Sequence, residues 1–493
     1  MTTRFTSCGG TLLTLAVLTV VWLGATAPTA SAATPPPARS VAGAWEGTLA
    51  GSIRFIVHLD RDVSGSWRAT ADSPDQNAMG MAVDRVTVTD DSLRFSMTRF
   101  GGEFAGRINP EHAEINGIWR QGATTLPLVF RPQGAATEAP RPGRPQEPKP
   151  PFPYDTTEVS FTNPRAAGVT IAGTLTTPKG KDPSPCVILI TGSGAQDRDE
   201  SVFGHKPFLV LADYLTRHGI AVLRCDDRGV GKSTGSSERV TSEDFAGDIE
   251  AAVAFLKTRK EIAPSKIGLI GHSEGGLIAP MVASRDKSVA FVVLLAAPGV
   301  PGDSVLITQS YLISRSMGQS DSLARVTQSV QRELVLYAKA FPDSARLAAK
   351  FRTVILPPKD VDPKKQKTND DKLDEIAGEQ ARLMLTPWMR FFLTHDPRAA
   401  LANLQCPVLA LNGEKDTQIS ADQNLPEIRA ALRKGGNRDA TAEKMPGLNH
   451  LFQTAKTGAL AEYGMIEETF APAALQKISD WIGSRMGRAS GKK

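Results

Sequence analysis

The sequence predicts an α/β protein with a mostly parallel central sheet and a helical cap, preceded by a small antiparallel all-β domain. Three observations support this fold class. From residue 154 onward, apolar runs of strand length alternate with helical stretches, which is typical of a parallel sheet buried on both faces. Between residues 40 and 131, short alternating segments are separated by frequent turns. The interval 298–404 is too long for a crossover connection and predicts an inserted cap.

The first 32 residues have the pattern of a secretory signal peptide. Arg4 gives a weakly positive start, 12–23 is apolar except for two threonines, and Ala30-Ser31-Ala32 supplies the small residues of a cleavage site. The alternative is a retained membrane anchor, but spanning a bilayer takes about 20 apolar residues. We therefore expect an exported protein, periplasmic or secreted, with no stable membrane insertion after cleavage.

Residues 40–131 are expected to form the antiparallel β domain, as a small barrel or a sandwich. Segments such as Ile53–Leu59 and Leu126–Phe130 have the length of single strands, with turn residues between them. Large aromatic residues are mostly buried, so Trp45, Trp67 and Trp119 are predicted to fill the core of this domain.

Residues 132–153 are predicted to be a linker. The stretch contains eight prolines mixed with charged residues. Proline fixes the backbone dihedral φ and removes the N–H donor, so this composition favours a semi-rigid polyproline spacer.

Residues 154–493 are expected to hold the α/β domain. The weaker segments Val159–Phe161 and Val169–Thr176 are predicted to begin its sheet as an antiparallel edge. The buried strands are predicted at Cys186–Ile190, Ile220–Arg224, Ile267–Ile270, Phe291–Leu295 and Val408–Leu411.

The cap at about 298–404 contains three stretches with helical periodicity, Ser304–Met317, Ser322–Phe341 and Lys372–Leu385. The insertion follows one predicted strand and precedes the next. We expect it to cover the carboxyl edge of the strands, where open α/β sheets bind ligands.

The pentapeptide Gly271-His272-Ser273-Glu274-Gly275 fits the pattern G-x-S-x-G. The pattern alone is weak, but a buried strand precedes it and a helix can begin at Gly276. A nucleophile elbow needs that order of strand, sharp turn and helix. Ser273 is therefore the predicted nucleophile. The alternative is a glycine-rich turn with a solvent-facing serine.

A serine nucleophile needs a base and an acid that orients the base, in the chain order serine, acid, histidine for this elbow. Of the two histidines after Ser273, His395 leaves no place for the acid, whereas His450 follows a probable final strand. The acid should end the strand Val408–Leu411, where Asp416 is the predicted residue and Glu414 the lesser candidate.

Two backbone N–H groups are expected to form an oxyanion hole. One belongs to Glu274, the residue after the nucleophile, and the other to the loop that follows Cys186–Ile190. In that loop either Ser193 or Gly194 is the donor, and the sequence leaves both open.

Five motifs together resemble the bacterial esterase EstD family, near the serine aminopeptidase-like branch of the α/β-hydrolases. The resemblance runs from about Tyr154 to the C-terminus and implies hydrolysis of short-chain acyl esters, with Ser273, Asp416 and His450 at the triad positions. Thr191 departs from the histidine that lipases often have there. The motifs are GHSEGG (271–276), GSGAQDRD (192–199), DDRGVGKSTG (226–235), PWMRFFLTHDP (387–397) and LNGEKD (411–416).

Other classes of function are disfavoured. The formal charge of +5 comes from 57 basic and 52 acidic residues without a basic stripe, so a nucleic-acid partner is not expected. Residues 229–234 imitate a phosphate-binding loop, but Asp226 stands where its first glycine belongs.

We therefore expect a small-molecule ester substrate and no metal or organic cofactor. The cysteines Cys186, Cys225 and Cys406 are predicted to be buried small hydrophobes, not a disulfide framework or metal site. The sequence leaves three questions open: peptidase or amidase activity in place of esterase activity, a binding role for the β domain with a vestigial hydrolase, and monomer or homodimer.

Overall fold

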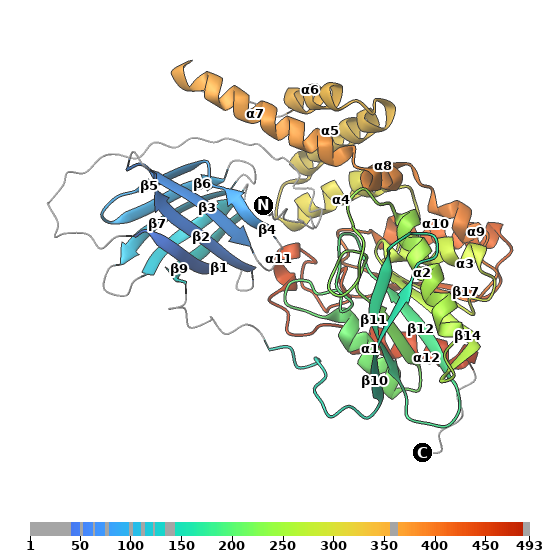
Figure 1. Cartoon of the computed structure of the whole chain (residues 1–493). Coiled ribbons are helices and arrows are strands. Elements are labelled where there is room, and N and C mark those ends of the chain that lie inside the picture. Colours follow the sequence, from blue (N-terminus) through green and yellow to red (C-terminus); the bar gives the residue numbers. More distant parts are fainter. Residues whose placement is uncertain are drawn as a thin grey trace.

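The computed structural model describes residues 41–49, 53–62, 65–73, 78–97, 102–109, 114–121, 124–133, 143–354 and 363–486. The predicted signal peptide, residues 1–32, lies outside the described residues. The expected class of fold is confirmed: an antiparallel β domain precedes an α/β domain with a helical cap (Figure 1).

The β domain is one sheet of nine antiparallel strands in the order β4-β3-β2-β1-β9-β8-β7-β6-β5. Its strands are β1 Gly43–Leu49, β2 Ile53–Arg61, β3 Trp67–Ser73, β4 Ala78–Ala82, β5 Arg85–Val88, β6 Ser92–Met97, β7 Gly102–Asn109, β8 Glu114–Gln121 and β9 Thr124–Pro132.

This sheet curls around an aromatic core. Strands β2 and β6 are five positions apart in the sheet, which would separate them by about 24 Å if the sheet were flat. The rings of Phe55 on β2 and Phe95 on β6 nevertheless lie 6.3 Å apart, and Phe55 lies 5.1 Å from Trp119 on β8. The domain is thus a curled half-barrel. Trp45 and Trp119 are buried in this core as predicted, whereas Trp67 is half-buried at its margin and stacks with Arg61.

The second half of the predicted linker is bound to the α/β domain. Arg144 donates hydrogen bonds to the carbonyls of Phe203 and Gly204 on one loop and of Gly464 and Ile466 on another. The Gln146 side chain accepts two backbone N–H groups and donates to the carbonyl of Phe470. This part of the linker is therefore a fixed strap across two loops.

The α/β domain is built on an eight-stranded sheet in the order β10-β11-β13-β12-β14-β15-β16-β17. The first two strands pair antiparallel, as predicted, and the six from β13 to β17 run parallel. The strands are β10 Asp155–Thr162, β11 Thr170–Thr177, β12 Ser184–Ile190, β13 Ala221–Cys225, β14 Ile262–His272, β15 Val292–Leu295, β16 Val408–Gly413 and β17 Ala440–Met445.

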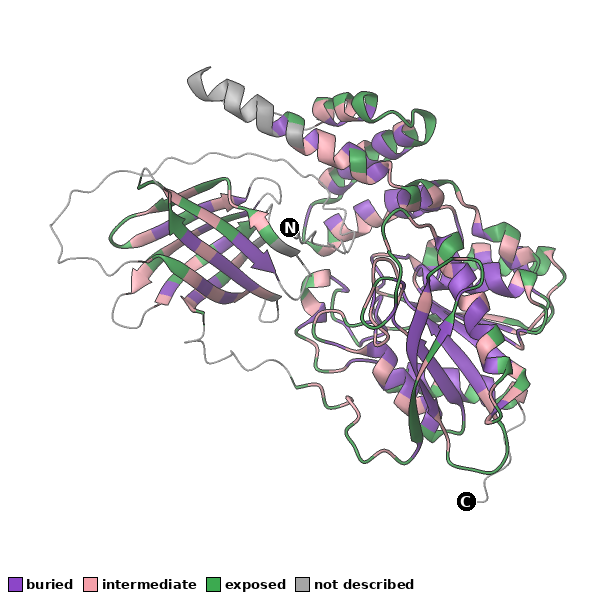
Figure 2. Cartoon of the chain, viewed as in Figure 1, coloured by how far each residue is buried: buried purple, intermediate pink, exposed green. Residues whose placement is uncertain are grey.

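Helices cover both faces of this sheet and leave its central strands buried (Figure 2). Because both faces are covered, the central strands have continuous apolar runs instead of alternating ones. One face packs against α2 Ser242–Lys257, α3 Gly275–Arg285 and α10 Ala421–Lys434, and the other against α1 Pro207–Arg217 and α12 Pro472–Met486. A further short helix is α11 Leu460–Tyr463.

Between β15 and β16 lies the helical insertion that was predicted as a cap. It has its own apolar cluster, to which all the cap helices from α4 to α8 contribute. Its helices are α4 Gly302–Ser316, α5 Asp321–Ala340, α6 Ser344–Val354, α7 Pro363–Met384, α8 Pro387–Thr394 and α9 Pro397–Ala402. Within the described part of the chain, no helix has the length and apolar character needed to cross a membrane.

Candidate active site

Ser273 lies at the turn between β14 and α3 with a left-handed backbone, φ 52°. Such a conformation is costly for a residue with a side chain and marks a strained turn. The flanking glycines permit it. A Cβ on Gly271 would collide with the backbone of Gly275, and a Cβ on Gly275 would collide with the carbonyl of Ile190. The strand, turn and helix of a nucleophile elbow are therefore all present.

His450 and Asp416 meet beside this turn. His450 Nδ1 lies 2.8 Å from Asp416 Oδ2, and both residues are buried. The other carboxylate oxygen of Asp416 accepts the N–H groups of Gln418 and Ile419, each at 2.8 Å. These bonds fix the carboxylate with one oxygen directed at the imidazole.

Glu414, the lesser candidate for the acid, accepts the N–H of Gly447 at 2.8 Å and is exposed. Asp416 and not Glu414 is therefore the carboxylate that the fold brings to His450.

Ser273 and His450 come from adjacent loops. His272, the neighbour of Ser273, lies 3.0 Å from the carbonyl oxygen of His450 through its Nε2, and the two rings are 4.8 Å apart. Within the described chain no hydrogen bond joins the Ser273 hydroxyl to His450. Catalytic hydrogen bonds are often long before substrate binds and tighten in the complex.

The loop after β12 lies directly against Ser273. A Cβ on Gly192 would be 3.3 Å from the Cβ of Ser273. The N–H of Gly192 is already used, because it donates to Glu200 Oε1 at 2.6 Å. Among the described residues, the N–H groups of Ser193, Gly194 and Glu274 have no hydrogen-bond acceptor. All three predicted oxyanion donors are thus available, and Ser193 and Gly194 both stay candidates.

The Glu274 carboxyl, next to Ser273 in the chain, is buried and accepts two side-chain hydrogen bonds. Its Oε1 accepts from the Ser242 hydroxyl at 2.6 Å and from Trp388 Nε1 on cap helix α8 at 2.7 Å. Burial raises the pKa of Glu274, and the hydrogen bonds oppose that shift. The residue therefore links the elbow to α2 and to the cap.

A second carboxyl, that of the half-buried Asp227, holds the loop after β12. Asp227 accepts the hydroxyl of Thr191 and the N–H of Gln196, each at 2.9 Å. Burial raises the pKa of Asp227 well above its ordinary value despite these bonds, and the charges of Glu274 and Glu200 add to the shift.

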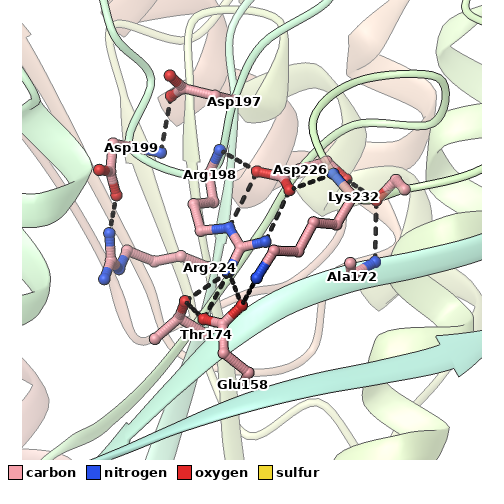
Figure 3. A network of polar contacts seen from close by, with 10 residues as sticks. Glu158, Ala172, Thr174, Asp197, Arg198, Asp199, Arg224, Asp226 and Lys232 are labelled. Carbon is pink, nitrogen blue, oxygen red and sulfur yellow. Dashed lines mark hydrogen bonds and ion pairs between the residues drawn. The ribbon is translucent and has the colours of Figure 1, made fainter.

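A polar network fixes the outer half of the same loop (Figure 3). Arg198 donates to both oxygens of Asp226, at 2.9 and 2.7 Å, and to Glu158 at 2.8 Å. The hydrogen bond from Lys232 to Glu158, assisted by Thr174 and Arg198 and opposed by partial burial, lowers the pKa of Glu158 to about 2. The network joins the loop to the antiparallel edge of the sheet, because Glu158 lies on β10.

In the segment 229–234, which imitates a phosphate-binding loop, the Asp226 carboxylate fills the space that a phosphate would need. The N–H of Lys232 donates to Asp226, and a Cβ on Gly231 would collide with the same carboxylate. The place of a phosphate is taken by Asp226. Among the described residues, no group of three or more histidine, cysteine, aspartate or glutamate side chains could hold a metal ion. The three predicted buried cysteines are free, Cys186 fully buried and Cys225 and Cys406 half-buried.

The sequence did not predict that Glu200 and His272 lie next to Ser273 as a buried, hydrogen-bonded pair. The available signals were the glutamate after the charged run Asp197-Arg198-Asp199 and the histidine inside the pentapeptide. His272 precedes Ser273 and so cannot be the general base in this chain order, which leaves its role invisible to a search for the triad.

The fold and the site define an α/β-hydrolase. The sequence profile described as serine aminopeptidase, S33, matches residues 206–454, half of the chain. The chain therefore belongs to this family of α/β-hydrolases.

Among curated relatives, esterase EstD of Thermotoga maritima is 34% identical over 151 residues, which are 30% of this chain and 36% of EstD. The Pseudomonas aeruginosa protein PA2218 is 26% identical over 36% of this chain and 43% of its own length. The chain thus spans less than half the length of these two relatives.

Among solved structures, PA2218 aligns with a TM-score of 0.42 and 17% identity, covering 69% of this chain and 96% of that one. An esterase of Pyrococcus furiosus, Pf2001, aligns with a TM-score of 0.39 and 17% identity, covering 68% and 94%.

Proposed function

We propose that the chain hydrolyses carboxylic esters of short acyl chains through a covalent acyl-enzyme on Ser273. The observation that carries the proposal is the buried Asp416–His450 bond of 2.8 Å beside a serine held at φ 52° on a strand–helix turn. A serine hydroxyl is a weak nucleophile until a base takes its proton, and an acid must fix the tautomer of that base. The likeness to esterase EstD supports the choice of an ester substrate.

The reaction would run in two halves. His450 takes the proton of Ser273, and the alkoxide attacks the ester carbonyl. The N–H of Glu274 and that of Ser193 or Gly194 stabilise the oxyanion. His450 then gives the proton to the departing alcohol. A water, deprotonated by His450, attacks the acyl-enzyme; the bond to Ser273 Oγ breaks, His450 returns the proton to that oxygen, and the acid is released. No step requires a metal or an organic cofactor.

Replacing Ser273 by alanine tests this mechanism. We expect Ser273→Ala to lower kcat on p-nitrophenyl butyrate by at least ~10³-fold with the thermal midpoint little changed. A fluorophosphonate probe should label the wild-type protein at Ser273 and leave the variant unlabelled. Unchanged turnover in a folded variant would refute the nucleophile, and failure to label the wild type would revive a non-catalytic role in binding.

A peptidase or amidase is the second candidate, favoured by the family's description as serine aminopeptidases. The same triad cleaves amides. Comparing kcat/KM for p-nitrophenyl butyrate with kcat/KM for aminoacyl p-nitroanilides on one preparation separates the two, and a higher value for the anilides would replace the ester proposal. A series of p-nitrophenyl esters then defines the acyl length.

Export to the periplasm or the medium is part of the proposal and rests on residues 1–32. N-terminal sequencing of protein expressed in a bacterial host tests it. Cleavage after Ala32 supports export, and an intact N-terminus in the cytoplasmic fraction argues against it.

A further inference from the structure

Two buried side chains beside the nucleophile have no part in the proposed chemistry. Glu200 is on the loop after β12 and His272 ends β14, and they are 4% and 6% exposed. His272 Nδ1 lies 2.9 Å from Glu200 Oε1. Burying two ionisable groups is costly unless they are paired and fully hydrogen-bonded, so their positions need an explanation.

The hydrogen bonds define the protonation of this pair. His272 Nε2 faces the carbonyl oxygen of His450 at 3.0 Å, and a carbonyl only accepts, so Nε2 carries a hydrogen. Nδ1 faces a carboxylate oxygen that already accepts the N–H of Gly192 at 2.6 Å. An imidazolium that donates from both nitrogens gives His272 Nδ1, His272 Nε2 and Glu200 Oε1 each a partner.

Electrostatics agree with that assignment. Burial lowers the pKa of His272, but the charge of Glu200 and the hydrogen bond to it outweigh burial, and the net direction is upward. The charge of Asp416 also raises the pKa of His272.

Each end of the pair holds one part of the site. Through Gly192, Glu200 fixes the start of the loop that carries the N–H groups of Ser193 and Gly194. Through the carbonyl of His450, His272 fixes the backbone of the general base.

The backbone of Glu200 is itself left-handed, with φ 52°. A residue with a side chain adopts this conformation only where its surroundings over-determine it. The two hydrogen bonds to its carboxylate are such a constraint.

We propose that Glu200 and His272 are positioning residues that hold the oxyanion loop and the general base at the distances the reaction needs. This inference rests on the proposed ester hydrolysis. Among the described contacts, neither side chain hydrogen-bonds to the Ser273 hydroxyl or to the ring of His450, so both act through Gly192 and the backbone of His450. Removing Glu200 should therefore weaken stabilisation of the transition state and leave ground-state binding nearly unchanged.

Three variants test the positioning role. Glu200→Ala removes both bonds to the carboxylate, and Glu200→Gln keeps an oxygen that can accept from Gly192 while removing the charge. Glu261→Gln is the matched control, because that glutamate pairs with Arg259 before the start of β14. Losing one oxyanion donor costs about 10²–10³-fold in kcat, and this range sets the expected loss for Glu200→Ala. Glu200→Gln should lose about tenfold, and the control should match wild type.

The decisive measurement is the inhibition constant Ki of an alkyl trifluoromethyl ketone. This inhibitor forms a hemiketal oxyanion on the nucleophile. If the pair positions the oxyanion loop, the Ki of this inhibitor rises in proportion to the loss of kcat/KM, while KM for p-nitrophenyl butyrate changes less than ~3-fold. A merely structural role would lower the thermal midpoint without that proportionality. An unchanged Ki in either folded variant overturns the proposal.

The controls distinguish a failure of the positioning role from a failure of the proposed ester hydrolysis. If wild type neither hydrolyses the ester nor reacts with a fluorophosphonate, the proposed function fails. If wild type does both and the Glu200 variants match it, only the positioning role fails. If Glu200→Ala does not fold, the Ki measured with Glu200→Gln decides, with a rise of at least ~3-fold expected.

Discussion

Substituting Asp416 by asparagine tests whether the site needs a hydrogen-bond acceptor, and not a donor, opposite His450 Nδ1. Asp416 Oδ1 accepts the N–H groups of Gln418 and Ile419, while Oδ2 faces His450 Nδ1 at 2.8 Å and accepts a longer bond of 3.2 Å from the Asn412 amide. The Asn412 amide also donates to the carbonyl of Ile419 at 2.6 Å, so it keeps an acceptor when Oδ2 is replaced. An asparagine there keeps its oxygen on the two N–H groups, because turning the amide over would lose two hydrogen bonds and oppose donors with donors. Each lost bond costs about 1 kcal/mol, and each buried group left without a partner costs more.

The amide nitrogen of Asp416→Asn must therefore face His450 Nδ1 and donate to it. The imidazole is then held with its hydrogen on Nε2, the nitrogen that should take the proton from Ser273. The same change in the serine-protease triad lowers kcat about 10⁴-fold, which corresponds to about 5 kcal/mol in the activation barrier. We expect a loss of 10³–10⁴-fold here, with KM for p-nitrophenyl butyrate little changed.

Glu414→Gln is the matched control, since Glu414 is the other acid in the same turn and can still accept from Gly447 as glutamine. Its kcat should stay within about twofold of wild type. Steady-state kinetics on both folded variants decide the matter. If Asp416→Asn retains more than about a tenth of the wild-type kcat, or if Glu414→Gln loses a thousandfold, the assignment of the acid is wrong.

Three further outcomes follow from single contacts. Trp388→Phe should keep the stacking on Phe392 but lose the hydrogen bond to Glu274, which lowers the free energy of unfolding in urea by ~1–2 kcal/mol. An unchanged free energy of unfolding would show that this hydrogen bond between the cap and the Ser273 turn does not stabilise the protein. Arg144→Ala should destabilise the α/β domain by ~2 kcal/mol or more, because it leaves four carbonyls without their donor, and an unchanged urea midpoint would refute the strap. Burial, with the charge of Arg144, lowers the pKa of His205 to about 4, below its unfolded value of 6.5. The unfolded state then binds the proton more tightly, so acidification from pH 6.5 to about 4 removes up to ~3 kcal/mol of stability; thermal midpoints of His205→Gln should fall less over that interval, and an equal fall would refute this.

The sequence was sufficient to predict the sheet, because buried parallel strands leave a local signal. Runs such as Cys186–Ile190 and Val408–Leu411 are apolar at every position, and they coincide closely with β12 and β16. The cap was harder to predict. Helices α4 and α5 have clear periodicity, but α8 and α9 are eight and six residues long and begin at prolines, too short for a pattern to stand out.

The site was predictable only where the chain order restricts the chemistry. Asp416 and His450 follow the nucleophile in the required sequence, and the structure brings them to 2.8 Å. Glu200 was not predictable, because its partner His272 is 72 residues away and the contact depends on how β12 and β14 pair. A long-range contact between two side chains leaves no period or spacing in the sequence.

Backbone strain explains why these contacts are needed. All six non-glycine residues with left-handed φ in the described chain lie on loops that follow the carboxyl ends of parallel strands, among them Glu200, Ser273, Ala296 and Phe452. Each such residue costs about 1–3 kcal/mol, so the edge that carries the site is the least relaxed part of the domain. Hydrogen bonds between neighbouring loops oppose that tendency to relax. On this view the hydrogen-bonded pair Glu200–His272 stabilises both the strained turn at Ser273 and the loop after β12 that lies beside it.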